Sequence, residues 1–420
     1  MKFKNRLSVI LCIGFFVSIH LMGSAQINEK KHYLEKVGII DSLYSKSLNE
    51  YREIYIQFPD NYVAQNLKKY PVVYILDGET LLPTVNNVQS FYSGGFTPEM
   101  VLVGISNTKH RTRDLTTSKI TEKYGRPFNE ENGEADNFSD FIETELIPYI
   151  ENKYPVTSFR TLIGHSYGGL FTIYTLINHP QLFSNYLAID PSLDWDDQKL
   201  LTDSKSKFAG NTYRGKSLFM SLNGQLHMGN PKVDLDNVLK DTSEFTLFAR
   251  SNIIFSDVVK QNKDNELAYK WKFYPRDLHG TISFPSIMDG LIFHFEWYQM
   301  ENTDKFNSPS TSKEELYNIV TYRAKKLKNH FGYSVPPYPE DLLNALGYMS
   351  LEREQLEKSK MFFEFAIQFY PNSPNVYNSM SEYSETTGDI NSALKFATKA
   401  YELDKNDNYK QRIEELKKHK

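Results

Sequence analysis

The pentapeptide at 164–168 reads Gly-His-Ser-Tyr-Gly, which places a serine hydroxyl between two glycines. The apolar run 161–163 precedes it, and a second apolar run, 170–177, follows it. This order predicts a strand, a sharp turn and a helix, with the serine at the turn. The glycines let backbone approach closely, and the first helical turn offers unpaired N–H groups to a developing negative charge. The pattern therefore predicts Ser166 as a nucleophile.

A serine nucleophile needs a base, which in such a site comes later in the chain, on a loop after a late strand. Six of the ten histidines lie beyond Ser166. His279 closely follows the apolar segment 270–274 and is followed by Gly280, so it lies where a loop after a strand is expected. The other five lie at a helix end, inside a helix, in a linker, in the tail or after an earlier strand. We therefore predict His279 as the base.

The acid that orients the base is less sharply indicated. It is expected after the strand that ends near Leu222 and before His279. The chain directly after that strand reads Asn-Gly-Gln and offers no acid. Asp236 is the preferred candidate, Asp234 is the second, and Asp277 is a local substitute.

Two backbone N–H groups are expected to stabilise the oxyanion. The first belongs to Tyr167, the residue after the nucleophile. The second is expected in the loop after the strand 71–76, where Gly78 lets backbone approach a ligand. The sequence lacks a His-x-x-x-His pattern, clustered carboxylates and a Gly-rich phosphate loop, so we expect neither a metal nor a cofactor.

The elements that must position these residues alternate between strands and helices from about residue 31 to 300. The continuous apolar runs 71–76 and 100–105 are typical of strands covered on both faces, whereas 53–58 alternates like a half-buried strand. Such alternation predicts an α/β fold with a mostly parallel, doubly wound sheet. Ligand sites in these sheets lie at the carboxyl ends of the strands, which is where Ser166 is expected.

A different pattern begins near residue 308. Segments 340–373 and 374–407 align at a period of 34, the tetratricopeptide length, with small residues recurring where two helices must approach closely. Residues 408–418 are expected to cap these repeats as a polar-faced helix, and 313–329 as a connecting helix. The predicted organisation is a signal peptide at 1–25, an α/β domain at 26–302, a linker at 303–339 and a small all-α helical-repeat domain at 340–420.

Composition and the N-terminus limit the possible partners. A net charge of −4 gives no electrostatic reason to expect nucleic acid. Basic residues at 2–6, an apolar run at 7–21 and small residues at 23–25 predict a cleaved secretory signal, hence a periplasmic protein without a membrane span. The one cysteine, Cys12, lies inside that signal, which excludes disulfides and thiolate chemistry from the mature chain.

At this point the chain resembles the esterase D, or putative esterase, family of α/β-hydrolases. The matching segments follow one another in order: 70–78, 103–107, 111–116, 164–169, 191–193 and 279–280. The resemblance implies an α/β-hydrolase fold and a serine carboxylic-ester hydrolase with Ser166 and His279 in its triad. It departs from the family at Gln225, where many members carry the triad acid, which leaves open a displaced acid or a Ser-His dyad.

The sequence therefore predicts an exported esterase that acts on a small-molecule or glycan ester through an acyl-serine, with helical repeats that can bind a protein partner. One alternative is an acyltransferase that uses the same site. The other is a partner-binding protein with a vestigial hydrolase domain.

Overall fold

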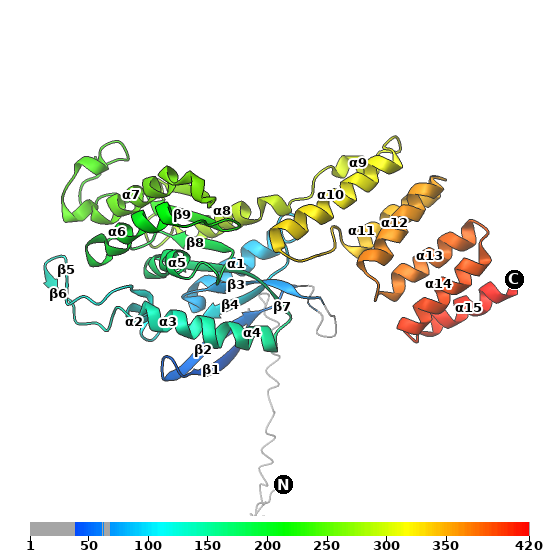
Figure 1. Ribbon diagram of the computed structural model, residues 1–420, viewed down its shortest axis with the longest axis horizontal. Helices are drawn as coiled ribbons and strands as arrows, with labels where there is room; N and C mark the ends of the chain where they lie inside the picture. The colour runs from blue at the N-terminus through cyan, green and yellow to red at the C-terminus, as the bar shows by residue number, and fades with distance from the viewer. Residues whose placement is uncertain (1–37, 61, 63–67, 420) are drawn as a thin grey trace, which may run out of the picture. The chain divides into compact units, whose positions relative to one another are not determined.

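The computed structural model describes residues 38–60, 62 and 68–419. Its central element is an eight-stranded sheet with the order β1-β2-β4-β3-β7-β8-β9-β10. The β1–β2 and β2–β4 pairs are antiparallel and the remaining pairs are parallel (Figure 1). The expected mostly parallel, doubly wound sheet is thus confirmed. The strands span Ile39–Ser45 (β1), Glu50–Gln57 (β2), Tyr70–Ile75 (β3), Val101–Ile105 (β4), Val156–His165 (β7), Asn185–Ile189 (β8), Ser217–Asn223 (β9) and Ala268–Tyr274 (β10).

The interior strands are apolar because helices cover both faces of the sheet. Every residue of β3, β4 and β8 is buried. In β2 only alternate residues are buried, as the half-buried pattern predicts. One face packs against α1 (Gly78–Tyr92) and α8 (Ser283–Phe295). The other packs against α3 (Ala135–Phe141), the π-helical turn η1 (Ile142–Leu146), α4 (Ile147–Lys153), α5 (Tyr167–Asn178), α6 (Trp195–Gly210) and α7 (Leu247–Gln261).

Shorter elements lie in the connections between the strands and the longer helices. Helix α2 follows β4, and a two-stranded hairpin, β5–β6, comes directly before α3 in the chain. Their bounds are Arg111–Leu115 (α2), Glu122–Lys123 (β5), Arg126–Pro127 (β6), Val238–Lys240 (η2), Glu244–Thr246 (η3), Lys263–Asn265 (η4), Glu296–Tyr298 (η5) and Thr303–Asn307 (α9).

The C-terminal part is helical throughout, and the helix starts repeat the predicted period. Helices α11 and α13 begin at 340 and 374, and α12 and α14 begin at 356 and 390, so both pairs are offset by 34 residues. Gly347 shows why a small residue is needed there, since a Cβ on it would lie 2.5 Å from the Phe363 ring. The tetratricopeptide assignment stays a prediction. The helices span Lys313–Phe331 (α10), Glu340–Glu352 (α11), Leu356–Phe369 (α12), Pro374–Thr386 (α13), Ile390–Leu403 (α14) and Asp407–Lys418 (α15).

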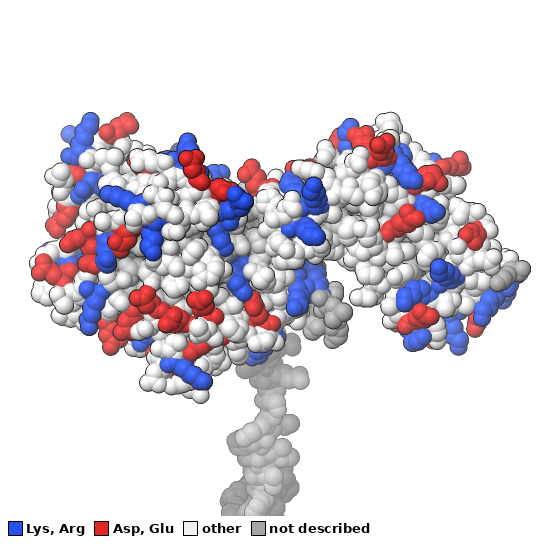
Figure 2. All heavy atoms as spheres, in the orientation of Figure 1, with Lys and Arg blue, Asp and Glu red and all other residues white. Residues whose placement is uncertain are grey.

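The N-terminal segment, membrane spans and surface charge bear on the possible partners. The predicted signal peptide, residues 1–25, lies outside the described residues. Across the described part of the chain, no helix has both the length and the apolar character needed to cross a membrane. Figure 2 shows acidic and basic side chains mixed over the visible face, with acidic ones gathered over α3 and α4.

Candidate active site

Ser166 lies at a sharp turn between β7 and α5. Its φ of 59° and ψ of −115° are strained for a residue with a Cβ. The Ser166 N–H donates to Ile189 O at 2.9 Å, which ties the turn to the end of β8. A Cβ on Gly164 would lie 2.2 Å from Gly168 O, so glycine is required at that position. The predicted order of strand, turn and helix is what the structure contains.

The Ser166 hydroxyl is half-buried and has a neighbour that the sequence did not indicate. Ser166 Oγ lies 3.2 Å from Ser192 Oγ, and the Ser192 N–H donates to Ser166 O at 3.1 Å. Ser192 belongs to the loop after β8. That loop therefore holds the nucleophile through both its backbone and its hydroxyl.

His279 lies on the loop after β10, the last strand, as expected for the base. Its Nδ1 lies 2.6 Å from Asp190 Oδ2, while its side chain is 43% exposed. An Nδ1–H that donates to a carboxylate leaves Nε2 free to accept a proton. The carbonyl of His279 accepts a hydrogen bond from His165 Nε2 at 2.9 Å, and the Phe248 ring meets the imidazole edge-on. The loop is thus held from two sides.

The carboxylate that contacts His279 is that of Asp190 and not that of Asp236, the candidate preferred from the sequence. Asp190 follows β8, one strand earlier than expected, and is fully buried. Its Oδ1 accepts the Asn223 N–H at 3.0 Å and its Oδ2 accepts the Asn223 side-chain amide at 2.6 Å. The end of β9, where the acid was expected, therefore supplies the amide that fixes the acid.

The three acids named from the sequence have other surroundings. Asp236 is exposed, and its N–H donates to Asp234 Oδ1 at 3.0 Å within a turn. Asp277 accepts the Thr281 hydroxyl at 3.0 Å. The sequence does contain a signal for Asp190, because this acid directly follows a buried strand. The carboxyl ends of neighbouring parallel strands meet at one edge of the sheet, so Asp190 lies near the end of the serine strand.

The two groups expected to form the oxyanion hole lie on neighbouring segments. Tyr167 is the first residue of α5, where a backbone N–H has no partner within its helix. Gly78 begins α1, and the preceding Asp77 carboxylate lies 3.6 Å from where a Cβ on Gly168 would be. The glycine at 78 also has a packing reason, because a Cβ there would lie 2.5 Å from Gly104 Cα.

A guanidinium group joins this loop to the end of β7. Arg111 donates to both oxygens of Asp77 at 2.7 and 2.8 Å and to His165 O at 3.1 Å. Burial alone lowers the pKa of Arg111, but the Asp77 carboxylate outweighs it and raises the pKa above its usual value. The bidentate ion pair therefore fixes the Asp77 loop beside the nucleophile turn.

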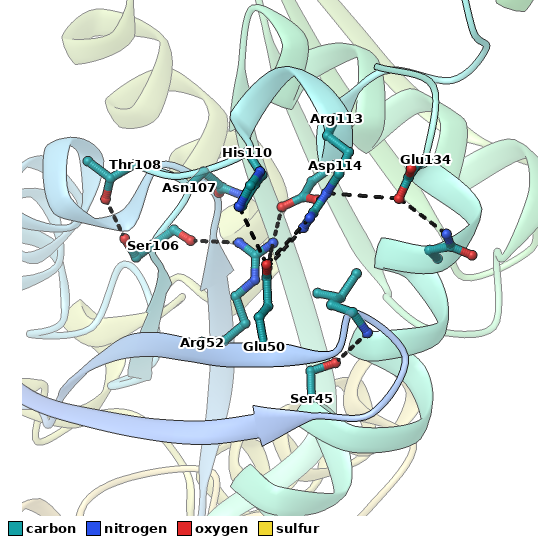
Figure 3. Close-up of polar contacts among 12 residues, drawn as sticks. Ser45, Glu50, Arg52, Ser106, Asn107, Thr108, His110, Arg113, Asp114 and Glu134 are labelled. Carbon is teal, nitrogen blue, oxygen red and sulfur yellow. Dashed lines mark hydrogen bonds and ion pairs between the residues drawn. The ribbon is translucent and has the colours of Figure 1, made fainter. Parts of the chain in front are cut away.

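Figure 3 shows the buried ion-pair network that anchors the segment carrying Arg111. The Asp114 carboxylate is fully buried between Arg52 of β2 and Arg113, which donates to it at 2.8 Å. Glu50 pairs with the same two arginines, at 2.6 and 2.9 Å. Burial raises the pKa of Asp114 in spite of these arginines. Because breaking such a network leaves buried charges unpaired, it fixes the segment to the sheet.

His165 carries no positive charge near neutral pH. Burial, and to a smaller extent the neighbouring His279, lowers the pKa of His165 to about 4. Its neutral ring donates through Nε2 to the His279 carbonyl and lies 4.6 Å from the His279 ring. His165, His279 and Asp190 have ligand atoms within 4.8 Å of one another, a spacing that a metal ion could use. His165 Nε2 bonds to His279 O and His279 Nδ1 to Asp190 Oδ2.

The strand order, the serine turn after β7 and the histidine loop after the last strand define the α/β-hydrolase fold. Residues 45–218 match the putative esterase family.

Among curated relatives, the ferri-bacillibactin esterase BesA of Bacillus subtilis is 35% identical over 150 residues, which are 31% of this chain and 51% of that protein. The siderophore enterobactin esterase of Emericella nidulans is 30% identical over 185 residues, which are 40% of this chain and 59% of that protein. The chain thus spans about half the length of the curated relatives it matches. Among solved structures, an IroE-like serine hydrolase from Shewanella oneidensis has a TM-score of 0.64 at 28% identity and covers 79% of this chain and 99% of its own.

Proposed function

We propose that this protein is a serine carboxylic-ester hydrolase. The observation that carries the proposal is the His279 imidazole, bonded to buried Asp190 at 2.6 Å, on the loop that packs against the end of the serine strand. The strained backbone of Ser166 supports it, because strain of about 1–3 kcal/mol persists where function requires it. The match to the putative esterase family supports the same chemistry.

The proposed reaction runs through an acyl-serine. His279 Nε2 takes the hydroxyl proton as Ser166 Oγ attacks the ester carbonyl, and Asp190 stabilises the imidazolium that forms. The N–H of Tyr167 and the Gly78 loop stabilise the oxyanion, each donor lowering the barrier by about 3 kcal/mol. The tetrahedral intermediate collapses, the C–O bond to the alcohol breaks, and His279 returns the proton to the departing alcohol. Water then repeats the sequence on the acyl-serine and releases the acid.

Ser166→Ala tests the proposal directly. We expect the variant to fold, to lose hydrolysis of p-nitrophenyl acetate by at least about 10³-fold, and to lose labelling by a fluorophosphonate probe. Full retention of hydrolysis by the folded variant would overturn the proposal.

For the substrate, we propose an ester bond of a siderophore, because the Emericella nidulans relative is named a siderophore enterobactin esterase and the Bacillus subtilis relative a ferri-bacillibactin esterase. A panel of siderophore, feruloyl, acetyl-sugar and thioester substrates tests this. A preference of less than about tenfold for siderophore esters over the others would count against it.

For localisation, we propose export with cleavage after Ala25. N-terminal sequencing of the mature protein is expected to begin at Gln26. A mature chain that retains residues 1–25 would contradict this.

A further inference from the structure

One ammonium group lies beside the nucleophile turn. Lys123, at the end of β5, donates from Nζ to the Tyr167 hydroxyl at 3.0 Å. Tyr167 directly follows Ser166. The hydrogen bond therefore places the ammonium at the end of the side chain of the residue next to the nucleophile.

Aromatic rings fix the position of this ammonium. Lys123 Nζ lies 5.2 Å from the Tyr124 ring centroid, 5.1 Å from that of Tyr167 and 5.2 Å from that of Trp195. The buried Trp195 indole donates to Ser118 O at 2.9 Å and packs edge-on against Tyr167. Since each ring face attracts a cation, the lysine is held in place rather than left to sample solvent.

The two cations beside the Tyr167 ring differ in their partners. Arg111 lies 5.6 Å from the ring centroid and is neutralised by its bidentate pair with Asp77. Lys123 takes part in none of the ion pairs found within 4.0 Å among residues 38–60, 62 and 68–419. The acid of the surrounding network, Asp194, is buried and accepts the Tyr124 hydroxyl. The charge of Lys123 is therefore open to a group that arrives with the substrate.

We infer that Lys123 recognises a negatively charged oxygen carried by the ester substrate next to an aromatic or apolar group. This inference rests on the proposed esterase function. The half-exposed ammonium supplies the charge, and the exposed Tyr124 ring supplies a face for the neighbouring group. A partly exposed ion pair of this kind changes affinity by up to about fivefold.

The kinetic test uses two matched substrate pairs. In the alcohol part, 4-acetoxybenzoate is compared with 4-acetoxybenzamide. In the acyl part, mono-p-nitrophenyl succinate is compared with p-nitrophenyl butyrate. The measured quantity is the ratio of kcat/KM for the anionic ester to that for the neutral ester. We expect Lys123→Met to lower this ratio by about three- to fivefold in at least one pair, and Lys123→Arg to preserve it.

The exposed Lys119, four residues earlier, provides a matched control. Lys119→Met is expected to keep the wild-type ratio. The inference is overturned if Lys123→Met leaves both ratios within about twofold of wild type, or if Lys119→Met lowers them equally, since either result assigns no local role to Lys123.

A binding measurement separates this inference from the esterase proposal. Calorimetry of benzoate and benzamide is carried out with the Ser166→Ala protein, which needs no turnover. We expect benzoate to bind more tightly than benzamide, and the added Lys123→Met change to remove the difference. If no ester is hydrolysed but this difference is seen, the esterase proposal fails and the anion site stands; equal binding of the two ligands removes the anion site.

Discussion

At the scale of single residues, the register of two strands explains how Asp190 reaches His279. Strands β8 and β9 are parallel, with Ile189 opposite Ser221. Asp190 follows Ile189, and Asn223 lies two residues beyond Ser221, so their side chains meet where both strands end. The Asp190 backbone has a φ of 46°, which turns the chain sharply after β8. The buried carboxylate is then held by the amides of Asn223 and presents Oδ2 to the imidazole.

Replacing Asp190 tests its proposed role as the triad acid. Asp190→Asn keeps the volume but removes the negative charge and replaces one acceptor oxygen by an NH2 donor, so the Nδ1–H tautomer of His279 loses its support. We expect kcat for p-nitrophenyl acetate to fall by about 10³- to 10⁴-fold.

The exposed Asp236 serves as the control for this variant. Asp236→Asn is expected to stay within about twofold of wild type. If Asp190→Asn retains most of its activity while folded, the site acts as a Ser-His dyad and the assignment of Asp190 is wrong.

The sequence indicated parts of this site and not others. Gly-x-Ser-x-Gly between two apolar runs is a local pattern, so the turn at Ser166 could be located, and the loop position of His279 follows from strand order. Asp190 could not be assigned, because its pairing with His279 joins residues 89 positions apart across a sheet register that the sequence does not specify. The Arg111–Asp77 pair, 34 positions apart, was missed for the same reason.

A second residue-scale prediction concerns His294, which is buried in α8 with its Nδ1 2.6 Å from the Ser217 hydroxyl. Burial lowers the pKa of His294 to about 3, so the unfolded chain binds this proton at a higher pH than the folded chain does. Stability from this group is complete above the unfolded pKa of about 6.5 and is lost as the pH falls from there toward 3.

Urea unfolding between pH 7 and pH 4.5 measures this effect. His294→Gln is expected to make the free energy of unfolding less dependent on pH, by up to about 1.4 kcal/mol per pH unit. The exposed His419 provides the control, and His419→Gln is expected to keep the wild-type slope. Equal slopes in all three proteins would show that His294 does not titrate differently on folding.

At the scale of elements, glycines decide how closely β7 and α5 meet. The turn at Ser166 brings Gly164 against Gly168, and a Cβ on Gly169 would lie 2.9 Å from Ile189 O. These nearest atoms belong to the backbone, which cannot move aside for an added Cβ as the end of a flexible side chain can. The nucleophile turn therefore depends on the absence of side chains at these positions as much as on the serine itself.

Gly164→Ala tests this dependence. The added methyl group overlaps with Gly168 O, so we expect the melting temperature to fall by several degrees and esterase activity to be lost. Gly210 ends α6 with no atom within 4 Å of an added Cβ, and Gly210→Ala is expected to be neutral or slightly stabilising. A Gly164→Ala protein with wild-type activity and stability would contradict the steric argument.

Most of the strands and helices could be predicted from the sequence. Buried parallel strands gave continuous apolar runs, and the period of 34 returned in the starts of α11 to α14. The left-handed residues 196–198 at the start of α6 could not be foreseen, because no glycine marks them.

At the scale of the whole chain, α10 does more than connect the sheet to the C-terminal helices, because its two ends pack in different cores. Leu327 and Phe331 near its end pack in the same core cluster as α1 and α8, whereas Leu316 and Val320 near its start pack with α11 and α12. One helix therefore contributes to the sheet's core and to the core of the helical pairs. The described residues, 38–60, 62 and 68–419, accordingly lie within one compact unit.

Arg323, in the middle of α10, holds two chain segments in place: the one that follows α8 and the one that precedes α11. Its side chain is buried and donates to the carbonyl oxygens of Tyr298, Gln299 and Pro337 at 2.7, 2.8 and 2.7 Å. The guanidinium also lies 5.3 Å from the ring centroids of both Tyr298 and Tyr338. The planar fork suits three carbonyls in a way that a lysine ammonium does not.

Arg323→Met removes the three donors and leaves buried carbonyl oxygens without partners, because methionine fills much of the volume but cannot donate. Hydrogen bonds to a charged group contribute about 1.5–3 kcal/mol each, so we expect the free energy of unfolding to fall by at least about 3 kcal/mol. We also expect limited proteolysis to cut between residues 299 and 339 faster than in wild type. The variant is expected to keep its esterase activity at low temperature, because the nucleophile turn at Ser166 is remote in sequence and is held by its own hydrogen bonds.

The exposed Lys325, two residues away, gives the control: Lys325→Met is expected to change neither unfolding nor proteolysis. If Arg323→Met unfolds at the wild-type urea concentration, the two cores are joined by the packing of Leu316, Val320, Leu327 and Phe331, and the arginine contributes no net stability there.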